Sequence, residues 1–118
     1  MTTVSYKTGV IEVAPNVYAF IQENCATNAG FIVSEEGALV IDSLMTPTLA
    51  GKLYSAIRNV TTSPIRYLVN THSHGDHVFG NQYFLPAPIL SHGNCRTELI
   101  EKFDANMQRY LGRTELIP

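Results

Sequence analysis

The sequence predicts a mixed α/β fold within one domain. Four short apolar runs rich in β-branched and aromatic residues come first, an amphipathic helical pattern follows, and strand-like and helix-like segments then alternate. The length of 118 residues suits a single domain. With 45% hydrophobic and 15% charged residues, the composition is that of a folded protein and excludes a disordered chain.

The first part of the chain predicts an antiparallel β-meander. Its apolar runs are Val10 to Val13, Val17 to Gln22, Gly30 to Val33 and Ala38 to Ile41. Turn-forming residues separate them, with Pro15 and Asn16 after the first run. The segment from Glu35 to Gly37 suits a glycine-containing hairpin between the last two.

The next segment predicts an amphipathic helix and a buried strand. Thr46 can cap the helix, and Pro47 suits its first position. Three to four residues separate the members of an apolar stripe, which are Leu49, Leu53, Ile57 and Val60. Pro64 ends this segment, and Ile65 to Val69 reads as a buried strand.

The remaining segments predict two more helices and one strand. A short helix is expected from about His77 to Phe84, and Pro88 to Leu90 is expected to be a strand. Asn94 can cap a long final helix that ends before Gly112. One face of that helix carries Leu99, Phe103, Met107 and Tyr110 with Leu111. The helices are expected to stack on one face of the sheet.

Charge and hydropathy limit the partners and the location that we expect for the chain. The net charge of −2 gives no basic footprint, so we expect neither nucleic acid nor a membrane as partner. No signal-peptide pattern opens the chain, and no apolar run approaches the ~20 residues of a membrane span, so a cytoplasmic location is expected. Cys25 and Cys95 are interpreted as two free thiols.

The candidate chemistry lies directly after the predicted strand Ile65 to Val69. His72, His74 and His77 fall within six residues, together with Asp76. Histidine is the commonest metal ligand, and imidazole with carboxylate suits zinc. In an extended segment, residues two apart project to the same side, so His72 and His74 can share one ion. Asp76 and His77 could face a neighbouring site, although Asp76 could instead cap the following helix.

This segment, His72-x-His74-x-Asp76-His77, resembles the signature of the metallo-β-lactamase-fold hydrolases. The motif is specific for that superfamily and nearly silent about the substrate. The resemblance implies a four-layered αββα sandwich of about twice this length, so residues 1–118 would form its N-terminal half. The surrounding sequence that also resembles the family comprises Asn28 to Val33, Ala38 to Ser43, Tyr67 to Thr71 and Val78 to Asn81.

The resemblance also implies a role for each site residue. His72 and His74 would hold a first zinc ion, and Asp76 and His77 a second, with Asp76 also orienting the attacking hydroxide as the catalytic residue. Asp42 resembles an aspartate that supports the ligands without touching the metal, but it could equally be a turn-forming residue before Ser43.

The fourth histidine, His92, lies too close to the motif in sequence to match the family's next metal ligand. We interpret it as a structural residue or as a support for the ligands. No later histidine or aspartate has a suitable context for the ligands that would complete the site. The 118-residue chain is therefore expected to be incomplete, to bind zinc weakly and to be inactive alone.

The implied function is zinc-dependent hydrolysis of a small-molecule ester, lactone, β-lactam or thioester by metal-bound hydroxide, with two zinc ions in the intact enzyme. One alternative is an iron-dependent persulfide dioxygenase of the same fold, with a single iron. Another is a non-catalytic fragment. Half of a sandwich exposes a sheet face, through which the chain is expected to self-associate as a homo-oligomer.

Overall fold

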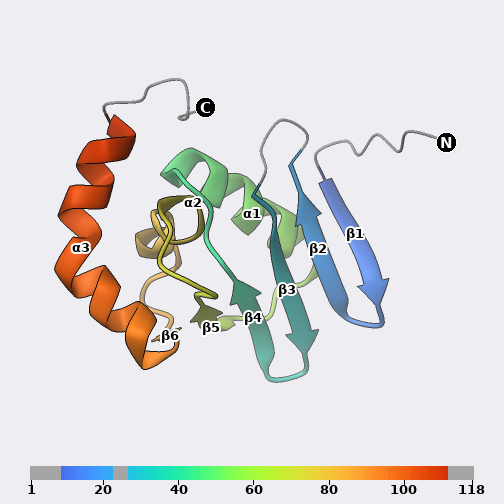
Figure 1. Ribbon diagram of the computed structural model, residues 1–118. Helices are drawn as coiled ribbons and strands as arrows, with labels where there is room; N and C mark the ends of the chain where they lie inside the picture. The colour runs from blue at the N-terminus through green and yellow to red at the C-terminus, as the bar shows by residue number, and fades with distance from the viewer. Residues whose placement is uncertain (1–8, 23–26, 112–118) are drawn as a thin grey trace, which may run out of the picture.

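The strands join in sequence order into one six-stranded sheet, β1-β2-β3-β4-β5-β6 (Figure 1). The computed structural model describes residues 9–22 and 27–111. The strands are β1 Gly9–Ala14, β2 Val17–Ile21, β3 Ala29–Ser34, β4 Gly37–Ile41, β5 Ile65–Val69 and β6 Ile89–Leu90. The first four strands are antiparallel, whereas β5 and β6 run parallel to β4. The predicted meander and the mixed α/β class are confirmed.

The helices are α1 Pro47–Val60, α2 Gly75–Val78, the 3₁₀ turn η1 Asn81–Phe84, and α3 Gly93–Leu111. The start of α1 confirms the sequence prediction, because the Thr46 hydroxyl accepts a hydrogen bond of 3.1 Å from the Leu49 N–H. Three residues of the predicted stripe are buried, but Val60, in the last turn, is exposed.

Two predicted helix boundaries are wrong. The helix expected from His77 to Phe84 is divided into α2 and η1, with Gly80 between them. Asn94 does not cap α3, because the helix begins one residue earlier, at Gly93. The ring of His92 takes the capping role, since its Nδ1 accepts a hydrogen bond of 3.0 Å from the Asn94 N–H.

The predicted apolar stripe of α3 is partly seen. Leu99, Phe103 and Met107 are half-buried, and the Phe103 ring packs edge-on against Phe79 at 5.4 Å between centroids. The side chains of the last predicted stripe residues, like Gly112 and Cys25, lie outside the described residues. Cys95 in the first turn of α3 is buried and makes no disulfide with any described residue.

The core lies between the sheet and α1, which covers one face of the strands (Figure 1). Its largest buried side chains include Phe31, Val40 and Leu68 from the sheet, and Leu53 and Ile57 from α1. Burying each such side chain contributes about 1.5–3 kcal/mol. This packing fixes β4 and β5 side by side, and the candidate site begins where these two strands end.

The opposite face of the sheet is apolar in every strand. Two rows of cross-strand neighbours form this face: Ile11, Ala19, Gly30, Ile41, Val69 and Leu90, and Val17, Ile32, Leu39 and Tyr67. Neither row contains a charged residue, yet Ile32 is 39% exposed and Tyr67 45% exposed. Soluble monomers rarely leave an apolar patch of this kind uncovered.

A close approach at Gly80 holds the segment after β4 against the turn between α2 and η1. The Gly80 N–H donates to the Leu44 carbonyl at 3.1 Å, and the Ser43 N–H donates to the His77 carbonyl at 2.9 Å. A Cβ atom at position 80 would lie 2.1 Å from the Ser43 carbonyl oxygen and 2.9 Å from the Ala50 Cβ. Only glycine fits there without moving the backbone.

In the described segments 9–22 and 27–111, no helix has the length and hydropathy needed to cross a membrane.

We expect the 118-residue chain to self-associate through the apolar sheet face. The double change Ile32→Lys with Tyr67→Lys should shift the population towards monomer, because it places two charges on that face. Sedimentation velocity over a range of concentrations measures the change. Val60→Lys alters an apolar residue of similar exposure (38%) on α1 and should leave the association unchanged. A wild-type chain that stays monomeric at every concentration would contradict this prediction.

Gly80→Ala should destabilise the fold by about 1–3 kcal/mol, the usual cost of forcing an atom into a packed interior. Urea unfolding followed by circular dichroism measures this free energy. Gly93→Ala is the matched control, because a Cβ atom there meets nothing within 4 Å. Equal stability of the two variants would show that the Gly80 contact relaxes without cost.

Candidate metal centre

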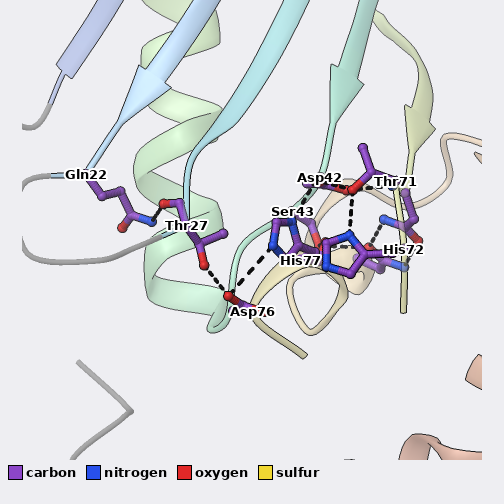
Figure 2. A network of polar contacts seen from close by, with 10 residues as sticks. Gln22, Thr27, Asp42, Ser43, Thr71, His72, Asp76 and His77 are labelled. Atoms are coloured by element: carbon purple, nitrogen blue, oxygen red, sulfur yellow. Dashed lines mark hydrogen bonds and ion pairs between the residues drawn. The ribbon is translucent and has the colours of Figure 1, made fainter. Parts of the chain in front are cut away.

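The structure brings the four predicted ligands together on the loop that follows β5. The ring centroids of His72 and His74 are 4.7 Å apart, and those of His72 and His77 are 4.0 Å apart. The Asp76 Oδ2 atom lies 3.7 Å from His77 Nε2. Figure 2 shows the His77 ring between Asp76 on one side and Asp42, the residue after β4, on the other, with His72 nearby. Three imidazoles and one carboxylate therefore form one cluster at the carboxyl end of the parallel strands.

Asp42 makes the turn after β4 and contacts the metal loop through its carboxylate. Its backbone has a left-handed φ of 65°, which ends β4 in a turn. Its carboxylate accepts hydrogen bonds from the Thr71 N–H, the Thr71 hydroxyl and His77 Nδ1, each at 2.8 Å. The side chain is only 5% exposed. A buried carboxylate requires such partners, and these donors tie the turn after β4 to the metal loop.

The same carboxylate determines which nitrogen of two rings is free. The Asp42 carboxylate can only accept, so His77 Nδ1 carries the proton and Nε2 of the neutral ring carries the lone pair. The single proton of the Thr71 hydroxyl goes to Asp42, so the 2.9 Å contact between Thr71 and His72 Nδ1 is donated by His72. We therefore assign both His72 and His77 a free Nε2 lone pair. Ligating histidines in proteins are held in this way.

Asp76 lies inside the first turn of α2 and does not cap it. The N-cap residue is His74, and no side chain caps this short helix. The capping interpretation of Asp76 is therefore wrong. Its Oδ2 atom instead accepts a hydrogen bond from the Thr27 hydroxyl. Sequence reasoning missed Thr27, whose partner is 49 positions away.

Two further contacts hold the loop from outside. The hydroxyl of Ser73, between the first two histidines, donates to Glu98 of α3. Asn70 and Asn81 exchange two hydrogen bonds of 3.0 and 2.7 Å, and the Ser43 hydroxyl donates to Asn81 Oδ1 at 2.7 Å. Asn70 is 2% exposed, so these contacts satisfy a buried amide. The loop is thus attached to β4, η1 and α3.

His92 makes its contacts outside the cluster of the four predicted ligands. Its ring is exposed and binds the first turn of α3. Among the described residues, no hydrogen bond or ring contact is seen between His92 and the four predicted ligands. The structural role of His92 is therefore to cap α3, while a supporting role at the metal stays a prediction.

The donor set fits a zinc-type metal in its chemistry but is incomplete in number. Imidazole nitrogens with a free lone pair and a carboxylate are zinc ligands, and a catalytic zinc normally has three protein ligands. Within residues 9–22 and 27–111, no group of three or more His, Cys, Asp or Glu side chains is arranged to hold an ion. The rings pack against one another at interplanar angles of 52° and 72°. The ligation itself, by His72 and His74 or by Asp76 and His77, stays a prediction.

The fold is similar to that of solved metallo-β-lactamases. An enzyme from Cronobacter sakazakii, in a mutant of its HARLDQ motif, matches with a TM-score of 0.68 and 19% identity over 79% of this chain and 38% of that one. The metallo-β-lactamase from Hirschia baltica matches with a TM-score of 0.68 and 16% identity over 80% and 47% of the two chains.

A further match is the sec-alkylsulfatase Pisa1 from Pseudomonas sp., with a TM-score of 0.67 and 22% identity over 84% of this chain and 17% of that one. At these identities the similarity shows the fold alone. The chain spans less than half the length of each of these three structures.

None of the curated proteins compared with the chain matches it. The sequence profile described as the metallo-beta-lactamase superfamily matches residues 23–117, which include all four predicted ligands and both strands that carry the site. The match agrees with the mixed sheet and with the structural similarity. The chain therefore belongs to the metallo-β-lactamase superfamily.

Proposed function

We propose that this protein contributes the metal-binding half of a zinc-dependent hydrolase. His72 and His74 would hold a first ion, and Asp76 and His77 a second. The observation that carries the proposal is the Asp42 contact network, which keeps Nε2 of both His72 and His77 free. When bound, zinc supplies a Lewis acid and lowers the pKa of a coordinated water from 15.7 to about 7.

The chain's own residues hold the predicted ligands in position. Asp42 fixes the tautomers, and Glu98 holds Ser73 between the two histidines of the first pair. Thr27 binds Oδ2 of Asp76 and so holds the carboxylate that would orient the attacking water. Orienting a nucleophile in this way can supply a large part of a reaction barrier, up to about 7–11 kcal/mol.

The substrate class we propose is a small molecule with a hydrolysable ester, lactone, β-lactam, thioester or sulfate ester. Structures named as β-lactamases and as a sec-alkylsulfatase share the fold, which supports a range of hydrolytic substrates. The choice among them depends on the residues that line the pocket, and most of the length of those proteins has no counterpart in this chain.

Zinc titration and hydrolysis assays of the chain test the proposal. His74→Ala should abolish zinc binding at the first position, because it removes a ligand. His92→Ala should cost far less zinc affinity, at most about the 10–100-fold that removing a supporting residue costs, because the His92 ring binds the start of α3. With two protein ligands per ion, we expect weak zinc binding and little turnover of a lactone, a β-lactam, a thioester or an alkyl sulfate by the 118 residues alone.

Equal loss of zinc in the two variants would show that His92 is itself a ligand. If the chain binds one iron ion and oxidises a persulfide, the dioxygenase alternative is correct and the hydrolase proposal is wrong. Absence of any bound metal would favour the non-catalytic alternative.

Asp42→Asn should weaken zinc binding by about 10–100-fold, the usual effect of removing a residue that orients a ligand. Asparagine tolerates the left-handed backbone at this position, so the turn is kept. Its amide group cannot accept from all three donors, so the histidine tautomers are no longer fixed. Nitrogen NMR of the imidazoles reports the tautomers directly. Asp104→Asn on the exposed side of α3 is the control, and unchanged His72 and His77 tautomers in Asp42→Asn would contradict the assignment.

A further inference from the structure

We infer that Thr27 is a positioning residue for Asp76, and that it sets the affinity of the second metal position independently of the first. The inference rests on the proposed metal centre. Thr27 stands outside the histidine-rich motif, 49 positions before its partner, at the point where the chain enters β3.

The contact joins a buried hydroxyl to a partly exposed carboxylate, since the Asp76 side chain is 29% exposed. The Thr27 hydroxyl donates to Asp76 Oδ2, and Figure 2 shows the hydroxyl pointing at that oxygen. Thr27 is only 7% exposed. A hydrogen bond between a hydroxyl and a carboxylate is of the strong, charge-assisted kind. A donor held by a buried residue restricts the rotation of the carboxylate.

Gln22 in turn holds Thr27 in place. The Gln22 side-chain amide donates to the Thr27 carbonyl at 2.8 Å, and the Gln22 N–H donates to Asn28 Oδ1 at 3.1 Å. Gln22 is 8% exposed, so Gln22 and Thr27 are both buried. The hydroxyl of Thr27 is therefore presented by a fixed backbone, which lowers the entropy that ordering Asp76 would cost.

The contact acts on one pair of ligands only. The Oδ2 atom that accepts from Thr27 is the same atom that lies 3.7 Å from His77 Nε2. Among the described residues, no hydrogen bond is seen between Thr27 and His72 or His74. A change at Thr27 should therefore reach the position of Asp76 and His77 and leave the other position unchanged.

Two substitutions separate the hydroxyl from the shape of the side chain. Thr27→Val keeps the branched shape and removes the donor, whereas Thr27→Ser keeps the donor and removes a methyl group. Thr46→Val is the control for general destabilisation, because it removes the hydroxyl that caps α1, and among the described residues no hydrogen bond is seen between that hydroxyl and the metal loop.

Titration of the full chain with zinc in a calorimeter, and with cobalt(II) followed by its visible spectrum, measures the two binding steps. We expect Thr27→Val to weaken one of the two steps by about 10–100-fold, as for other residues that support a ligand. The other step should stay within about two-fold. Thr27→Ser should restore both steps and the cobalt spectrum, and Thr46→Val should change neither.

Two equally weakened steps in Thr27→Val, or no recovery in Thr27→Ser, would show a structural role and overturn the inference. Two wild-type steps that Thr27→Val leaves unchanged would overturn it while the proposed function stands. A wild-type chain that binds no metal would overturn both.

Discussion

The carboxylate of Asp42 is the contact on which the arrangement of the metal loop depends. Parallel pairing of β4 with β5 brings the ends of the two strands to one edge of the sheet. Asp42 follows the first strand, and Thr71 follows the second. A buried carboxylate at this junction must be satisfied by donors, and the donors available are Thr71 and His77. The need to satisfy one charge thus orders the rings that chemistry would use.

The sequence was informative wherever the signal was local. The stripe and the Thr46 cap define α1, because helix period and capping involve residues at most four positions apart. The histidine motif is likewise contiguous, so its place on a loop after a buried strand could be predicted. Asp42 could be suggested but not decided, because turn and support roles use the same residue type. In the structure its backbone makes the turn and its carboxylate binds His77, while the role beside a metal stays a prediction.

What the sequence did not show depends on contacts between distant segments. Thr27 and Glu98 are ordinary polar residues until folding places them beside Asp76 and Ser73. The division between α2 and η1 follows from the approach of Gly80 to the Ser43 carbonyl, which no local pattern reveals. The cap of α3 was misplaced by two residues for a different reason, since an imidazole is a less familiar helix cap than asparagine.

The strand order has a consequence for the speed and timing of folding. Every strand pairs with the next strand along the chain, but α1 lies between β4 and β5, and α2 and η1 lie between β5 and β6. The antiparallel hairpin pairings among β1 to β4 are local and can form quickly, whereas the parallel pairings of β5 and β6 join residues 21 to 28 positions apart and form more slowly. The connections that organise the metal loop close over 29 to 49 positions, and each doubling of a loop adds only about 0.6 kcal/mol of closure entropy. The local meander can therefore form first, and the histidine loop is ordered only when the parallel pairing of β4 with β5 closes.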